Sequence, residues 1–164
     1  MSIRVKKNYL TFKEKKFKCI IGRSGFSKDK REGDGSTPVG SFNIENIYYR
    51  ADKVNNFYTN ISKITIHKLD GWCDDPKQKE YNQLIKFPYN FSAEKLYRDD
   101  SLYNIVCVLN YNTNPVTPGI GSAIFMHVAH DEYKPTEGCV ALKQEDLIYL
   151  LSFVDDKTEI ILGD

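Results

Sequence analysis

The chain has 164 residues, which is the usual size of one domain. Apolar residues make up 41%, aromatic residues 13% and charged residues 27%, a globular composition that argues against a disordered, fibrous or membrane-embedded protein. The formal net charge is only +1, so the charge balance gives no reason to expect nucleic acid or an anionic membrane as a partner.

Membrane insertion and export leave hydrophobic signatures that this chain lacks. Its longest apolar run, residues 105–109, is far shorter than the roughly 18 residues of a membrane helix. Residues 1–7 do not contain the apolar stretch of a signal peptide. We therefore expect no membrane-spanning segment and no ordinary export signal.

The first half of the chain predicts short strands separated by loops. Val, Ile and Phe set between lysines predict strands at residues 3–5 and 17–22. The segment 22–40 is dense in Gly, Ser, Asp and Pro, which predicts a long loop with turns. Alternating polar and apolar residues predict a half-buried strand over 41–47, and a further short strand is expected at 64–66.

The middle of the chain carries weaker patterns. Residues 70–90 mix aromatics, prolines and acids without periodicity, which predicts an ordered loop. Ser92 is a candidate cap for a short helix over 93–96.

The last third carries the clearest patterns. Apolar runs predict strands at 105–110 and 123–128, both buried on two faces. A stripe of apolar residues predicts a helix over 144–154, with acidic residues near its positive N-terminal end. Residues 159–162 predict a closing strand. The whole pattern indicates a mainly β fold with one or two helices.

The four cysteines are too loosely spaced to indicate a disulfide scaffold. Cys19 and Cys107 lie inside apolar strand-like runs, which predicts buried side chains with a packing role. Cys73, beside Trp72, is also expected to be structural. Cys139 follows a glycine in polar surroundings and needs a separate interpretation.

A metal site can be drawn from His127, His130 and Cys139. The two histidines are three residues apart at a strand end, however, so their side chains are expected on opposite faces. A fourth ligand in a structural zinc pattern is also missing. We therefore predict no metal.

A nucleophilic pair is the sharper interpretation of the same region. His127 ends a predicted buried strand, and Cys139 follows twelve residues later, just after Gly138. A catalytic cysteine needs a base within hydrogen-bond reach, partial exposure and nearby N–H donors. The spacing permits all three, although a purely structural role for both residues remains the alternative from spacing alone.

These residues resemble the L,D-transpeptidase family, the YkuD-type catalytic domain of bacterial cell-wall enzymes. That family has a strand ending in His, then a Ser/Thr-His-Gly-Cys element and a helix with an Asp-Leu step, and it also has a Thr-Pro-x-Gly-x-Phe hairpin. The matching segments here are 125–127, 136–139, 145–147 and 30–42, and residues 71–76 and 121–125 look like a branch of short proteins in that family.

The match has three departures. Glu137 stands where the family usually has His, and Ala141 stands where many members have Arg. The interval from His127 to Thr136 is also shorter than usual, which predicts a trimmed substrate loop. The nucleophile and the base are unaffected, so these departures concern substrate recognition.

The resemblance implies a single L,D-transpeptidase-like catalytic domain over 1–164, of β-sandwich or barrel-like form. It implies that Cys139, as thiolate, attacks an L-to-D peptide bond of a peptidoglycan stem peptide, with His127 as base. The backbone amides of Gly138 and Cys139 would hold the oxyanion. The thioester would pass to an amine, giving a cross-link, and no cofactor or metal is implied.

Several residues are expected near this pair, each with simple packing as the alternative. Thr136 and Ser122 flank the site and can hydrogen-bond His127 or substrate. Acidic side chains would favour the ammonium groups of stem peptides, and an aromatic side chain would line the cleft beside them. These further substrate-binding candidates are Glu137, Asp74 and Trp72.

Two rival functions remain open at this stage. One is an L,D-carboxypeptidase or endopeptidase that hydrolyses the same bond, and the other is a non-catalytic wall-binding module. The expected partners are peptidoglycan stem peptides or their fragments. That substrate class implies the cell envelope or periplasm, whereas the missing export signal makes the cytoplasm the alternative location.

Overall fold

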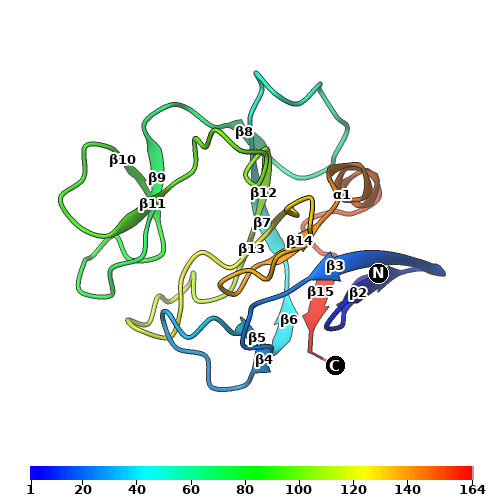
Figure 1. Cartoon of the computed structure of the whole chain (residues 1–164), viewed down its shortest axis with the longest axis horizontal. Helices are drawn as coiled ribbons and strands as arrows, with labels where there is room; N and C mark the ends of the chain where they lie inside the picture. Colours follow the sequence, from blue (N-terminus) through cyan, green and yellow to red (C-terminus); the bar gives the residue numbers. More distant parts are fainter. Residues whose placement is uncertain (164) are drawn as a thin grey trace.

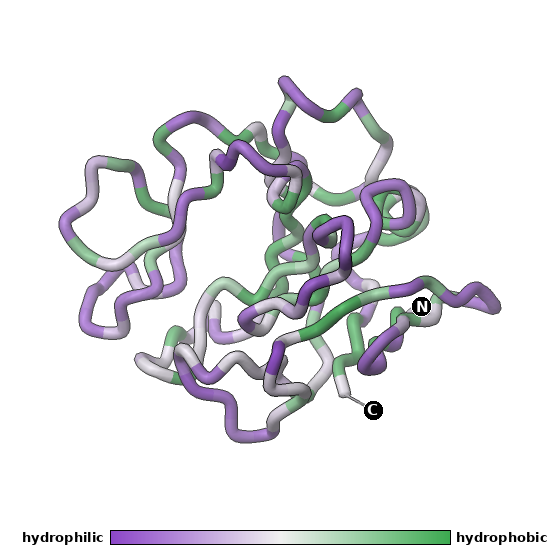
Figure 2. The backbone as a smooth tube through the Cα atoms, viewed as in Figure 1, coloured by the Kyte–Doolittle hydropathy of each residue, from purple (hydrophilic) through white to green (hydrophobic). Residues whose placement is uncertain are grey.

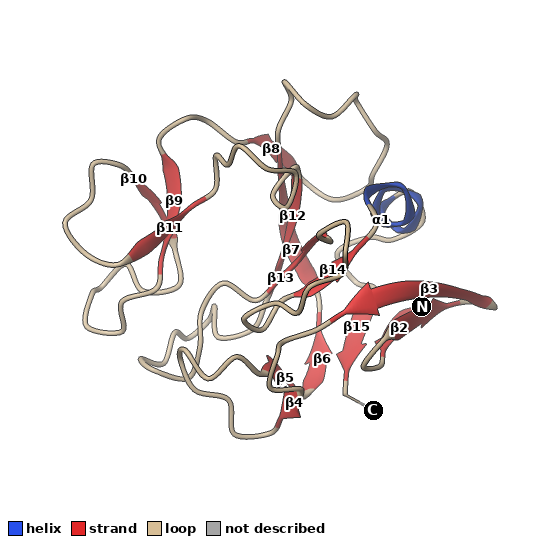
Figure 3. Ribbon diagram, viewed as in Figure 1, coloured by secondary structure: helices blue, strands red, loops and turns tan. Residues whose placement is uncertain are grey.

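The computed structural model describes residues 1–163 and is built around a ten-stranded mixed sheet (Figures 1 and 3). Across the sheet the strands are β6 (Gly40–Phe42), β15 (Glu159–Leu162), β1 (Ser2–Val5), β2 (Tyr9–Phe12), β3 (Lys15–Ile20), β14 (Val140–Leu142), β13 (Phe125–Val128), β12 (Ile105–Leu109), β7 (Ile44–Tyr49) and β8 (Lys63–Thr65).

Two smaller sheets and one helix complete the described part of the chain. One small sheet has the order β10 (Leu84–Lys86), β9 (Asp70–Cys73) and β11 (Ala93–Lys95), and Figure 1 shows it set apart from the large sheet. The other pairs β4 (Phe26–Ser27) with β5 (Thr37–Pro38). The helix α1 spans Gln144–Leu151.

The large sheet has to curl strongly because of its connectivity. β6 forms one edge, and β7 is next to the strand at the opposite edge, yet only Asn43 separates them in the sequence. The main chain of Asn43 is tied to Asn110, at the end of β12, by two hydrogen bonds of 2.8 and 3.0 Å. The two margins of the sheet therefore meet, which confirms the predicted mainly β, barrel-like fold.

The central strands are buried on both faces, as their apolar runs predict. Every residue of β12, β13 and β14 is buried. Cys107 pairs with Met126, and Met126 pairs with Val140, so these three side chains share one face in the main core cluster. Figure 2 shows hydrophobic residues concentrated along the strands that cross the middle of the molecule.

The helix α1 covers that face with the predicted apolar stripe. Leu147, Leu150 and Leu151 are buried, and acidic Glu145 and Asp146 lie in the first turn, where the helix dipole favours them. The helix begins where the sequence predicts and ends three residues earlier than predicted. Of the residues that the structure describes, no helix is both long and apolar enough to cross a membrane.

In the middle of the chain the structure differs from two predictions. Residues 93–96 do not form a helix, because Ala93–Lys95 is the strand β11 and pairs with β9. A helix of one turn gains too little by itself to compete with such pairing. The expected loop over 70–90 also contains β9 and β10: β9 lacks alternation because all of it is buried, and β10 is only three residues long.

The predicted strand over 41–47 is interrupted, since β6 and β7 join different margins of the sheet. The sequence patterns also left β2 and β14 unassigned. The predictions for 22–40 as mainly loop, and for buried Cys19 and Cys107, are confirmed, and Cys73 is buried as well.

Candidate active site

Cys139 and His127 lie on the same face of two neighbouring strands. β13 and β14 run parallel, with His127 opposite Ala141 and Met126 opposite Val140. Because side chains alternate along a strand, Phe125 and His127 share one face, and Cys139, one residue before β14, shares the face of Ala141. The register therefore directs the thiol and the imidazole to the same side of the sheet.

Both side chains line a cavity of about 510 Å³. The walls come from several parts of the chain, among them the loop after β4, the strand β11, the segment between β11 and β12, the turn before β13 and the turn that carries Cys139. Of the substrate-binding candidates, the lining includes Asp74, Ser122, Thr136 and Glu137. The structure thus brings together residues that are up to about a hundred positions apart in the sequence.

The Cys139 sulfur is buried and held by two backbone groups. Its side chain has 8% exposure. Sγ donates to the carbonyl oxygen of Ala123 at 3.1 Å and accepts from the amide of Phe125 at 3.4 Å. Burial, with a smaller contribution from the charge of Glu94, raises the pKa of the thiol to about 12, while the Phe125 amide and Lys30 oppose that rise.

His127 is held by its own strand. Nδ1 lies 2.8 Å from the carbonyl oxygen of Val128, which favours the tautomer with the proton on Nδ1 and Nε2 as the acceptor. The ring of Tyr103 packs edge-on to the imidazole, with centroids 5.2 Å apart. Burial lowers the pKa of His127 to about 4, so the imidazole is neutral near pH 7.

Cys139 is buried, whereas the sequence analysis expects a partly exposed thiol, and burial is the main cause of both pKa shifts. Burial opposes charge on both groups, so the resting pair is a thiol beside a neutral imidazole. The thiolate can then form only as the imidazole takes the proton. The arrangement is suited to general base catalysis rather than to a preformed ion pair.

The turn before Cys139 is fixed from two sides. The Thr136 hydroxyl donates to the Cys139 carbonyl oxygen at 2.6 Å and accepts from the Gly138 amide at 3.1 Å. Gly138 has a φ of +147°, and a Cβ there would lie 2.7 Å from the carbonyl oxygen of Ser36. Glycine is therefore required, and its amide is already engaged within the turn, unlike the free oxyanion donor that the sequence predicts.

The loop over 22–40 supports this turn from behind. Thr37 donates its hydroxyl proton to the Gly138 carbonyl oxygen at 2.8 Å and accepts from the Gly22 amide at 2.9 Å. The amide of Arg23 donates to the Thr136 carbonyl oxygen at 2.8 Å. The Thr-Pro hairpin thus fixes the position of the turn that carries Cys139.

The Arg23 side chain forms an ion pair with Glu137 at 3.0 Å, on the solvent side of the cavity. Both side chains are more than half exposed, so water screens the pair and its contribution to stability is small. Glu137 therefore marks the rim of the site.

Acidic residues also line the cavity. Glu94 accepts a hydrogen bond from Tyr103 at 2.7 Å, and burial raises the pKa of its carboxyl to about 7. Glu32 accepts hydrogen bonds from Tyr81, at 2.7 Å, and from Ser122. Ser122 is therefore held by a carboxylate, and within residues 1–163 it forms no hydrogen bond with His127.

Trp72 differs from its expected place in the cleft. It is buried, packs edge-on against Phe125 at 5.3 Å, and donates its indole N–H to Asn82 at 2.9 Å. Asn82 also accepts from the amide of Ala123 at 2.9 Å. Trp72 and Asn82 thus lie behind the cavity wall and support the segment that holds Cys139.

The structure adds cavity residues that the sequence analysis missed, chiefly Lys30, Glu94 and Tyr103. Glu94 fell in the wrongly predicted helix, and only the family hairpin pointed to the region of Lys30. His130 also lines the cavity, where its Nδ1 accepts from the Glu132 amide. Across residues 1–163, no three His, Cys, Asp or Glu side chains are placed to hold a metal ion.

Comparison with known proteins gives one finding. Curated proteins and solved structures yield no significant match. The model of the L,D-transpeptidase catalytic domain, YkuD, matches residues 4–162, nearly the whole chain. The match spans the strand of His127, the turn of Cys139 and the hairpin that supports that turn, and this chain therefore belongs to the L,D-transpeptidase catalytic-domain family.

Proposed function

We propose that this member of a peptidoglycan-acting family works as a cysteine-dependent acyltransferase. Cys139 is the nucleophile and His127 the general base. The donor is a stem tetrapeptide whose last peptide bond joins an L-centre to a D-residue. The observation that carries the proposal is one cavity lined by both a thiol and an imidazole whose Nε2 is free of the ring proton.

The first half-reaction moves one proton and exchanges one bond. The S–H of Cys139 turns from the Ala123 carbonyl oxygen toward His127, and Nε2 takes the proton as Sγ attacks the carbonyl carbon. The C=O electron pair moves onto oxygen and gives a tetrahedral intermediate. Its collapse breaks the C–N bond, and the imidazolium returns the proton to the leaving D-amino acid.

The second half-reaction runs the same steps with a new nucleophile. An amine from a second stem attacks the thioester, His127 accepts its proton, and the thiol leaves with that proton. The product is a cross-link. Glu137 supports an amine acceptor, because a carboxylate on the cavity rim favours an ammonium group.

The test is product analysis with a defined tetrapeptide ending in D-alanine. Wild-type protein should release D-alanine and, with a second stem peptide present, form a cross-linked dimer. Cys139→Ala should do neither, whereas Cys107→Ala should retain both activities. D-Alanine release without a dimer at saturating acceptor would favour the hydrolase instead, and no release would favour a non-catalytic binding module.

A further inference from the structure

A buried lysine lies in the same cavity as Cys139 and has no place in the mechanism so far. The Lys30 side chain is 4% exposed and lines the cavity. Its Nζ donates to Oδ1 of Asp34 at 2.9 Å. Burying a charged lysine is costly unless the charge has partners, so its position needs an explanation.

Two glycines leave room for this side chain. A Cβ on Gly121 would lie 2.8 Å from Cε of Lys30, and a Cβ on Gly138 would lie 3.3 Å from Nζ. The lysine therefore passes between the segment before β13 and the turn that carries the nucleophile. Its ammonium group ends beside Gly138, the residue that precedes Cys139.

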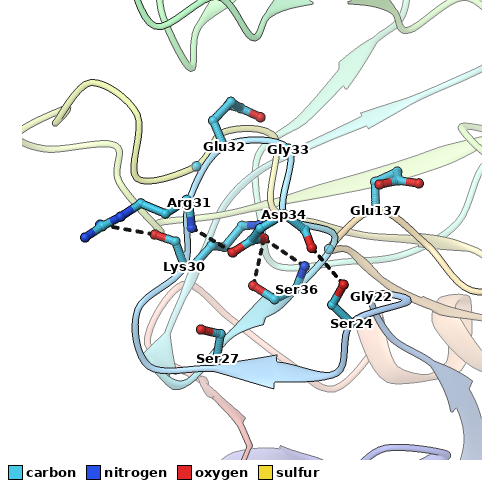
Figure 4. Close-up of polar contacts among 12 residues, drawn as sticks. Gly22, Ser24, Ser27, Lys30, Arg31, Glu32, Gly33, Asp34, Ser36 and Glu137 are labelled. Carbon is cyan, nitrogen blue, oxygen red and sulfur yellow. Dashed lines mark hydrogen bonds and ion pairs between the residues drawn. The ribbon is translucent and has the colours of Figure 1, made fainter.

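Asp34 offsets the lysine charge only in part. Its carboxylate also accepts from the amides of Arg31 and Ser36 and from the Ser36 hydroxyl, as Figure 4 shows. These bonds hold the pKa of Asp34 well below its usual range, even though burial acts in the opposite direction. One anion is thus shared among four donors.

The ammonium group of Lys30 has N–H donors that the bond to Asp34 does not use. It has three N–H groups, Asp34 accepts one, and no other acceptor within residues 1–163 holds the remaining two. The Gly138 amide, by contrast, is already engaged with Thr136. Beside Gly138, one of the two residues whose amides the resemblance assigns to the oxyanion, there is therefore a cation with unused donors, and the Gly138 amide itself is engaged.

We propose that Lys30 is a catalytic residue, which donates a hydrogen bond to the substrate carbonyl oxygen as that oxygen becomes negatively charged in the acylation of Cys139. This inference rests on the proposed function. As the S–C bond forms, the C=O electron pair moves onto oxygen and Lys30 stabilises it while keeping its own proton. The same charge favours the thiolate of Cys139 on the way to that intermediate.

The test compares single-turnover acylation rates, read by intact mass with the tetrapeptide, in Lys30→Met and wild type. We expect the maximal rate to fall by about 10²–10³-fold, with the half-saturating concentration within about threefold of wild type. Lys28→Met is the matched control, because Lys28 is exposed on the same loop, and it should acylate at the wild-type rate.

Two results would overturn the inference. One is a folded Lys30→Met protein with a maximal rate within about threefold of wild type. The other is a loss confined to the half-saturating concentration, which would make Lys30 a binder of a substrate carboxylate. If Lys30→Met does not fold, Lys30→Gln, which keeps a donor without the charge, should still lose at least tenfold, and a wild-type rate would contradict the role.

A substrate-independent measurement separates this inference from the proposed function. Iodoacetamide is neutral and reacts through the developing thiolate of Cys139, so Lys30→Met should slow its alkylation at pH 7 by at least tenfold. If the wild type forms no acyl adduct, the proposed function fails by itself. Equal alkylation rates in both proteins would count against the charge effect of Lys30 whatever the outcome with peptide.

Discussion

The two faces of the strands β12, β13 and β14 are both buried, but they are built differently. One face carries Cys107, Met126 and Leu142, packs against the leucines of α1, and belongs to the large apolar core. The other face carries Phe125, His127 and Cys139 and opens into the cavity. Because side chains alternate along these strands, one face packs into the core and the other lines the cavity.

The two cysteines on these faces show what makes the difference. Burial raises the pKa of the Cys107 thiol and of the Cys139 thiol, so neither is a thiolate at neutral pH. Cys107 has only desolvation acting on it, whereas Cys139 has an amide donor, a cation and a cavity next to it. The two thiols thus differ in their neighbours rather than in the direction of their pKa shifts.

The largest expected effect comes from exchanging the two cysteines in turn for alanine. Cys139→Ala should lower D-alanine release by at least about 10³-fold, because it removes the attacking atom. Cys107→Ala should keep the activity and lower the free energy of unfolding by about 1–2 kcal/mol, since it only opens a small void. Release assays and urea denaturation measure the two effects, and equal activities would contradict the distinction between the faces.

The next largest effect is expected from replacing the proposed general base, His127. His127→Gln should lower the acylation rate by about 10²–10⁴-fold, because no other group then takes the thiol proton. The half-saturating peptide concentration should change little. Stopped-time mass spectrometry measures the rate, and a variant as fast as wild type would show that the proton goes elsewhere.

A substitution on the face covered by α1 should change the stability of the protein and leave the reactivity of Cys139 unchanged. Leu147 has 0% exposure, and Leu147→Ala should lower the free energy of unfolding by about 2–5 kcal/mol. The alkylation rate of Cys139 in the folded protein should stay unchanged. A matching change in alkylation would mean that the two faces are coupled through the sheet.

Acid should destabilise the cavity face through His127. The folded pKa is about 4, below the value of 6.5 for an ordinary histidine, so the unfolded chain binds the proton first. The free energy of unfolding should therefore fall as pH drops from 6.5 to 4, with a component of roughly 3 kcal/mol. His127→Gln should lack that component in denaturant titrations at the two pH values, and identical slopes would contradict the assignment.

Glu94 should change the pH dependence of the free energy of unfolding in the opposite direction to His127, by a smaller amount. Its folded pKa is about 7 against 4.5 for an ordinary glutamate, so the folded protein keeps the proton longer and loses stability as pH rises from 4.5 to 7. Glu94→Gln should gain on the order of 2 kcal/mol relative to wild type between pH 5 and pH 8. A constant difference between the two proteins would show that Glu94 is ionised throughout.

Local patterns predict the parts of this molecule whose structure is decided locally. The run that forms β12, the apolar stripe of α1 and the closing strand β15 all appear at their predicted places. His127 and Cys139 are recognisable because they lie in a family motif. Each of these features depends on neighbours within a few residues along the chain.

The remaining features depend on contacts between distant segments. Residues 93–95 form a strand because β9 offers a partner, and Trp72 is buried because Phe125 and Asn82 surround it. Lys30 reaches the turn of Cys139 because two glycines, far apart in the sequence, leave room for its side chain. No pattern of spacing around these residues reveals such contacts.

Peptide mapping tests the role of the cavity face most directly. Wild-type protein is mixed with the tetrapeptide, quenched in acid to preserve a thioester, and digested. We predict an adduct of the peptide without its terminal residue, on the fragment that contains Cys139 and on no other. Product formation with Cys139 unmodified, or an adduct on a different residue, would contradict it.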